Sequence, residues 1–233
     1  MKCHCARLAL VAIAIVSLST WVRPSLGAPT VFFARDAAIG APVNSQAKFN
    51  HFTTGLASFG VNNIESAAGF NPTLTFGSTG ITAATNGVLA QAAPGFVIGL
   101  QGLLELDAVG FGQIDTSFTF NQHITAFGVF VTQGGDGANN NPTTFRLTDT
   151  SASTFVDVPI QVGPGWNPTN VFFLGVADTV PFDKVTIIES VDFNDGMLYD
   201  NVVAGFVPEP STFVLGGLGL VVLSQVVRQR KRD

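Results

Sequence analysis

The sequence predicts an all-β fold, a single antiparallel β-sandwich of jelly-roll type, lying between two terminal segments of different character. Only 12% of the 233 residues are charged, whereas the chain holds 21 Phe and 25 Gly. This composition favours strands and tight turns over helices. Short segments with strand periodicity recur along the middle of the chain, separated by clusters of Gly, Asn, Asp and Pro. That spacing is typical of a sandwich or barrel.

Polar and apolar residues alternate in 116–120 and 144–148, as in strands with one buried face. Residues 124–132 differ, because Phe127 points to one face and Phe130 to the other, so both faces are apolar. Further short strands are predicted at 171–176, 185–188 and 198–204, with turns at 134–137, 139–142, 163–165 and 194–196. One short helix is expected over residues 35–46, although Gly40 and Pro42 disfavour it.

The first 27 residues have the order of a secretory signal peptide. Lys2 and Arg7 supply positive charge, residues 8–18 are almost wholly apolar, and small residues precede a cut after Gly27. We therefore expect signal peptidase to remove residues 1–27. The alternative is an uncleaved anchor, for which the apolar run is short, since a span needs about 20 residues.

Both cysteines of the chain, Cys3 and Cys5, lie in this first segment. The mature chain would then contain no thiol. Disulfide bonds, cysteine catalysis and cysteine-ligated metal centres are therefore excluded, and an exported domain must be stabilised by its core alone.

The C-terminal segment has three consecutive parts. Residues 207–212 are extended, because their prolines prevent a helix. Residues 213–227 contain no charge and predict a transmembrane helix, and the basic end at 228–233 would stay in the cytoplasm. The motif that begins this tail consists of Val207, Pro208, Glu209 and Pro210.

This order resembles the PEP-CTERM sorting tail, also grouped as "ice-binding protein C-terminal", which is read by exosortases. The resemblance implies that a membrane exosortase cuts near Pro208 to Pro210. Before the cut, the helix would hold the exported protein in the membrane. Afterwards, the body would reach the cell surface or the extracellular matrix. The alternative is an ordinary single-span anchor.

Residues 28–206 form the predicted extracellular domain. This part holds four of the 11 basic residues and 14 of the 16 acidic residues, so its net charge is −10. An acidic surface repels nucleic acids, which are therefore excluded as partners.

No catalytic signature is evident, and the body is predicted not to be an enzyme. His51 and His123 lie far apart in the sequence, without the spacing of metal ligands. The nearest approach to a site is a cluster of oxygen ligands suited to calcium around Gly196, formed by Asp192, Asn194, Asp195 and Asp200. An Asx-rich hairpin turn is the alternative interpretation.

Sugar binding requires exposed aromatic rings beside polar groups. The aromatic candidates are Trp166 and Tyr199, and the polar candidate beside Tyr199 is Asn201. Residues 124–130, 172–176 and 195–202 resemble the β-sandwich domains of PEP-CTERM proteins, which look like lectin or carbohydrate-binding modules. We therefore expect a non-enzymatic surface or matrix protein that binds polysaccharide. An extracellular enzyme acting on glycans or esters, and a purely structural or adhesive subunit, are the alternatives.

Overall fold

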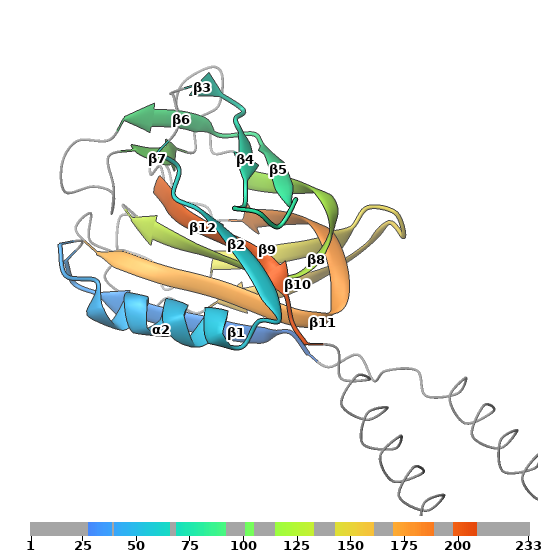
Figure 1. Cartoon of the computed structure of the whole chain (residues 1–233), viewed down its shortest axis with the longest axis horizontal. Helices are drawn as coiled ribbons and strands as arrows, with labels where there is room; N and C mark the ends of the chain where they lie inside the picture. Colours follow the sequence, from blue (N-terminus) through green and yellow to red (C-terminus); the bar gives the residue numbers. More distant parts are fainter. Residues whose placement is uncertain are drawn as a thin grey trace, which may run out of the picture.

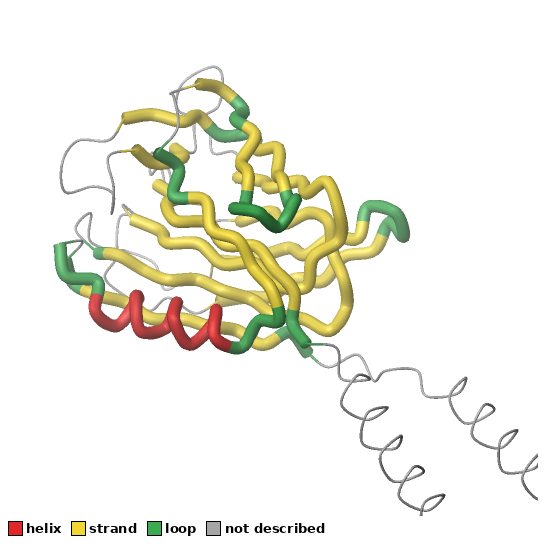
Figure 2. Tube along the Cα trace, viewed as in Figure 1, coloured by secondary structure: helices red, strands yellow, loops and turns green. Residues whose placement is uncertain are grey.

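The computed structural model describes residues 28–38, 40–65, 69–91, 101–104, 115–132, 143–160, 170–188 and 198–208. Secondary structure extends from Thr30 to Phe206 (Figures 1 and 2). The elements are β1 (Thr30–Asp36), α2 (Val43–Thr54), β2 (Ser58–Asn62), β3 (Gly69–Phe70), β4 (Thr73–Thr75), β5 (Thr82–Thr85), β6 (Val88–Gln91), β7 (Gln101–Leu104), β8 (Thr116–Thr132), β9 (Thr143–Asp149), β10 (Thr154–Ile160), β11 (Val171–Ile188) and β12 (Leu198–Phe206).

Two long strands, β8 and β11, divide the twelve-stranded antiparallel sheet of the described chain into two layers. Their pairing is interrupted between Ala177 and Lys184 of β11, where the register shifts twice. Sheet A comprises β1, residues 171–177 of β11, residues 126–132 of β8, β12 and β2, with β7, β6 and β3 beyond the start of β12. Sheet B comprises β10, β9, residues 184–188 of β11, residues 116–120 of β8, β5 and β4.

The main core lies between the two sheets and is rich in phenylalanine. Phe127 of sheet A is fully buried, and its ring centroid lies 5.1 Å from that of Phe118 and 5.7 Å from that of Phe145, both in sheet B. Aromatic pairs at such distances contribute beyond the burial of their area. The predicted all-β antiparallel sandwich is confirmed.

The outer face of sheet A is covered by α2 (Figure 1). Phe49 and Phe52 of the helix pack against Phe130 and Phe173 of the sheet. Both faces of residues 126–132 are therefore buried, one against sheet B and one against the helix. This arrangement explains why that segment is apolar on both sides.

The helix predicted over residues 35–46 is wrong in position. Residues 30–36 pair as β1 with residues 171–177, and the helix begins only at Val43. Pro42 occupies the N-cap position, where its missing N–H costs no helical hydrogen bond. The strands predicted at 116–120 and 124–132 are one continuous strand, as are those at 171–176 and 185–188. The four predicted turns lie outside the described residues.

Within the described residues, no helix has the length and apolar character needed to cross a membrane. The predicted signal peptide and the predicted transmembrane helix at 213–227 both lie outside these residues.

Asp36 at the end of β1 caps α2 from a distance in sequence. Its carboxylate accepts hydrogen bonds from the backbone N–H groups of Asn44 (2.9 Å) and Ser45 (2.7 Å), which belong to the first helical turn. These N–H groups otherwise have no partner within a helix. Burial raises the pKa of Asp36, but the hydrogen bonds from Ser45 and Asn44 together outweigh it, so the pKa is lowered overall.

We predict that Asp36→Ala destabilises the protein by about 1 kcal/mol, the usual cost of losing a helix cap. Thermal unfolding at neutral pH should then show a melting temperature about 2–4 °C lower than wild type. Because the folded-state pKa is lowered, the stabilisation is present above about pH 4 and is lost as the pH falls through the lowered value. A melting difference that persists undiminished at acid pH would contradict this role.

A pair of glycines makes room for the packing of Phe173 between sheet A and α2. Gly128 and Gly175 are partners across β8 and β11. A Cβ added at Gly128 would lie 2.8 Å from Cζ of Phe173 and 2.9 Å from Cγ1 of Val203. Because both neighbours are buried, neither can move away freely.

Gly128→Ala should therefore destabilise the fold by about 1–3 kcal/mol through overpacking. Thermal unfolding measures the effect, and Gly40→Ala is the matched control, since a Cβ at Gly40 meets nothing within 4 Å. Equal melting temperatures for the two variants would show that the glycine pair is not required by packing.

Candidate functional site

The last described residues join the sandwich directly to the predicted processing motif. The backbone N–H of Val207 donates to Oγ1 of Thr125 at 2.7 Å, and its side chain packs in the cluster beneath α2. The carbonyl of Phe206 accepts a hydrogen bond from the N–H of Ala57 at 2.8 Å. Pro208 is exposed, and Glu209 and Pro210 lie outside the described residues. The motif thus starts at the surface of the body without an intervening linker.

The beginning and the end of the body lie at one end of sheet A. Thr30 of β1 pairs with Ala177, which pairs with Ala126, which in turn pairs with Gly205 of β12. These residues form one row across the sheet. In Figure 1, β1 begins and β12 ends at the lower right of the body. Both predicted terminal segments are therefore attached at the same end.

The segments that contain several of the predicted site residues connect in sequence to the opposite end of sheet A. There Val171, Thr132 and Leu198 form another row across the sheet. Leu198 directly follows segment 189–197, which contains Asp192, Asn194 and Asp195, and Val171 closely follows segment 161–169, which contains Trp166. These four residues lie outside the described part, so their proposed roles stay predictions.

Tyr199 does not have the exposed position expected of a sugar-stacking ring. Its side chain is 0% exposed, and its ring lies edge-on to Phe118 with the centroids 6.3 Å apart. It pairs with Val131 on the core face of sheet A. The prediction of Tyr199 as a binding platform is wrong for this conformation, because the residue is part of the core.

Asp200 and Asn201 form a β-bulge in β12. The register against β8 shifts between Asp200 and Val203, and Asn201 has a φ of +44°, a conformation that Asn tolerates well. The buried carboxylate of Asp200 accepts a hydrogen bond from the N–H of Asn201 at 2.6 Å.

The described residues contain no group of three or more His, Cys, Asp or Glu side chains that could hold a metal ion. The calcium site therefore stays a prediction that depends on residues 192–195.

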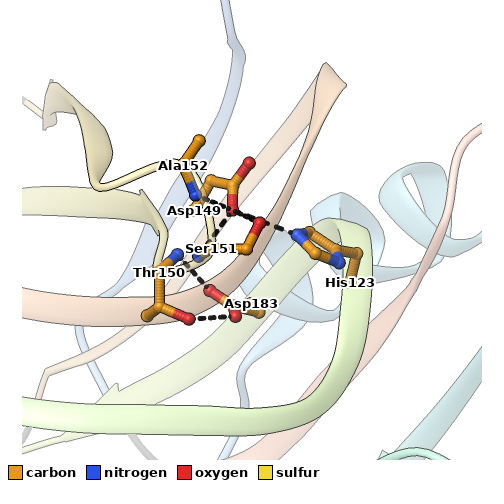
Figure 3. Close-up of polar contacts among 6 residues, drawn as sticks. All are labelled: His123, Asp149, Thr150, Ser151, Ala152 and Asp183. Atoms are coloured by element: carbon orange, nitrogen blue, oxygen red, sulfur yellow. Dashed lines mark hydrogen bonds and ion pairs between the residues drawn. The ribbon is translucent and has the colours of Figure 1, made fainter.

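A polar cluster closes the turn between β9 and β10 (Figure 3). Asp149 accepts hydrogen bonds from the hydroxyl of Ser151 (2.6 Å) and from the N–H groups of Ser151 (3.0 Å) and Ala152 (3.1 Å), and Nε2 of His123 lies 3.2 Å from the same oxygen. Asp183 accepts from the N–H and the hydroxyl of Thr150. The cluster thus fastens the hairpin to the bends of β8 and β11.

These contacts account for the acidity of Asp149. The hydroxyl of Ser151, the N–H of Ala152 and the ring of His123 together lower its pKa to about 2. A carboxylate whose lone pairs are engaged within its own turn is suited to holding that turn, not to general-base chemistry near neutral pH.

A second group of side chains lies on the outer face of sheet B. Arg146 of β9 and Asp157 of β10 are direct cross-strand partners, joined by two hydrogen bonds of 2.7 and 2.9 Å. The guanidinium carbon of Arg146 also lies 4.5 Å from the ring centroid of Phe155, which is 61% exposed. These contacts produce a stack of three side chains on the surface. The hydrogen bonds from Arg146 hold the pKa of Asp157 below its usual range.

This group was missed at the level of sequence because the strand 154–160 was not predicted. The signal that could have found it is the alternation of Phe155 and Asp157 with Val156 and Val158. Pro159 interrupts that pattern, as prolines often do in edge strands.

Comparison with known families identifies the end of the chain. Residues 206–231 match the PEP-CTERM protein-sorting motif. The chain carries this sorting signal. The motif implies an exported protein that is anchored at the membrane before an exosortase processes it. The match begins at Phe206, the last residue of β12, and it covers only the tail, so it does not describe the body. No curated protein matches the chain.

Solved structures similar to the body include carbohydrate-binding modules. One is a family 29 module with cellulohexaose (13% identity, 64% of this chain and 94% of the module, TM-score 0.35). Another is the C-terminal family 22 module of Clostridium thermocellum Xyn10B (14% identity, 65% and 94%, TM-score 0.34). A third is a family 61 module with β-1,4-galactotriose (10% identity, 65% and 92%, TM-score 0.23). TM-scores of this size do not establish a shared fold.

The turn geometry predicts how the titration of Asp149 changes on mutation. Ser151→Ala removes the largest of the contacts that lower this pKa, so the carboxyl should titrate at a higher pH than in the wild type, closer to about 3.9. A carboxyl NMR titration measures the midpoint. Ser153→Ala in the same turn is the control, since the contacts of Asp149 do not involve it. A midpoint near 2 in the Ser151 variant would contradict the assigned cause.

Proposed function

We propose that this protein is a non-enzymatic component of the cell surface or extracellular matrix, released from a membrane-anchored precursor and binding polysaccharide. The observation that supports this most strongly is the position of the sorting motif. It begins where β12 ends, and among the described residues Val207 is the last one packed against the body. A cut near Pro208 to Pro210 would leave every described strand intact.

The charge of the body fits this location. A net charge of −10 over residues 28–206 keeps a protein soluble and separate from other acidic polymers. The absence of cysteine from residues 28–206 also makes the body independent of the redox state outside the cell. Neither property requires a catalytic site.

For the binding of polysaccharide, Trp166 and Asn201 remain candidates, together with a calcium site at Asp192, Asn194, Asp195 and Asp200. Trp166 and residues 192–195 belong to segments that are followed by β11 and β12, and these two strands begin in the same row of sheet A, on either side of β8. Signal peptidase and an exosortase would be the processing partners.

The intact mass of the protein recovered outside the cell tests the proposed processing. We expect a chain that starts near Ala28 and ends near Pro208 to Pro210, found only when the exosortase is present. Replacing Pro208, Glu209 and Pro210 by Ala should keep the protein in the membrane, while Gly40→Ala serves as a folded control. A mass that retains residues 228–233, unaffected by loss of the exosortase, would make this an ordinary membrane-anchored domain.

A further inference from the structure

We propose that the outer face of sheet B binds an uncharged polysaccharide, which lies across the strands with one sugar stacked on Phe155. This inference rests on the proposed function and assigns its binding surface. The surface, called the B face below, consists of Phe155 and Asp157 of β10, Thr148 and Arg146 of β9, Lys184 and Thr186 of β11, and Ser117 and Thr119 of β8.

Phe155 exposes a large aromatic side chain on the outer face of sheet B. An aromatic ring that is 61% exposed contributes little to the core. Val158, three residues further along β10, points inward and belongs to the main core, whereas the adjacent Val156 is 43% exposed. A large apolar side chain placed on a polar face is the feature expected of a contact surface for a ligand that is itself partly apolar. Pyranose sugars meet this condition, because their ring C–H groups form an apolar face.

The ring of Phe155 is held in place before any ligand arrives. The guanidinium of Arg146 lies over Phe155, and Asp157 fixes that guanidinium through two hydrogen bonds. Bidentate pairing of this kind restrains both side chains. A ring that is already ordered loses less entropy on binding, so the stack favours a preorganised platform.

A row of polar side chains continues from the ring of Phe155 across the sheet. Phe155 pairs with Thr148, Thr148 with Lys184, and Lys184 with Thr119. Since neighbouring strands lie about 4.8 Å apart, this row extends about 14 Å across the sheet. A parallel row contains Asp157, Arg146, Thr186 and Ser117. Hydroxyl and charged groups in such rows can donate to and accept from the hydroxyls of an extended sugar chain.

The charge of the B face and of the surrounding body favours one class of polysaccharide. Arg146 and Lys184 are two of the four basic residues in the body, whose net charge is −10. Asp157 and the neighbouring Asp115 balance these two positive charges, and Asp149 and Asp183 lie in the adjoining turn. An acidic polymer would gain little on the B face and would be repelled by the remaining surface. An uncharged chain meets no such repulsion.

The alternative role of the stack is structural, because a cross-strand Arg–Asp pair beside a phenylalanine also stabilises the β9–β10 hairpin. The two roles differ in what Phe155→Ala changes. A purely structural stack would alter melting but not binding. The B face proposal requires that binding is lost while the fold remains.

Affinity electrophoresis of the exported protein through gels containing hydroxyethylcellulose, glucomannan, arabinoxylan or alginate tests the proposal. Wild type should be retarded by at least one of the three uncharged polymers and not by alginate. Phe155→Ala should weaken that retardation about tenfold or more, as truncation of an aromatic anchor does. Phe59→Ala is the matched control, since Phe59 of β2 is also exposed (41%) but belongs to sheet A.

A second variant keeps the test independent of the hairpin. Thr119→Gln places a longer neutral side chain in the same row on β8, away from Arg146 and Phe155, and should also weaken retardation. Wild-type binding that neither variant changes overturns the B face as the binding surface but leaves polysaccharide binding intact. Retardation by alginate alone overturns the uncharged class. No retardation of wild type in any gel overturns both this proposal and the proposed polysaccharide binding.

Discussion

The packing of Phe127 between the two sheets is the contact on which the rest of the structure depends. This ring projects from sheet A and meets aromatic rings from two strands of sheet B. Residues 28–206 contain no cysteine. This interdigitated aromatic core therefore supplies the stabilisation that disulfides supply in many small exported domains. Because β8 supplies Phe127 to one layer and Phe118 to the other, the same strand that forms the core also joins the layers.

The covering of sheet A follows from the same strand. Once Phe127 points inward, Phe130 must point outward, and α2 is needed to bury it. Asp36 fixes the start of that helix to the end of β1. Sheet B has no helix on its outer side among the described elements, so its outward residues are free to be polar. The difference between a covered and an open sheet therefore explains why Arg146 and Lys184 lie where they do.

Local pattern predicted the segments that are buried on regular faces, such as residues 124–132 and 144–148, together with the fold class. It failed where distant pairing or irregular geometry decides. Residues 30–36 are a strand only because they pair with β11, about 140 positions later. Tyr199 stands beside Asp200 and Asn201 and was therefore expected to be an exposed ring, but its pairing with Val131 places it in the core. Pro42 was taken as a helix breaker, although it lies just before the first helical residue. The sorting tail was predictable because it is read as a linear segment.

The position of β12 also has a mechanical consequence. Any load on the tail enters the body through Phe206 and Val207, at the C-terminal end of a strand that is hydrogen-bonded to β8 on one side and to β2 on the other. Tension along this strand is shared by both ladders at once, so the hydrogen bonds cannot open one after another from a free edge. While the precursor is tethered, the domain is thus attached through one of its most firmly held strands, and drag from the surroundings is resisted by the centre of sheet A.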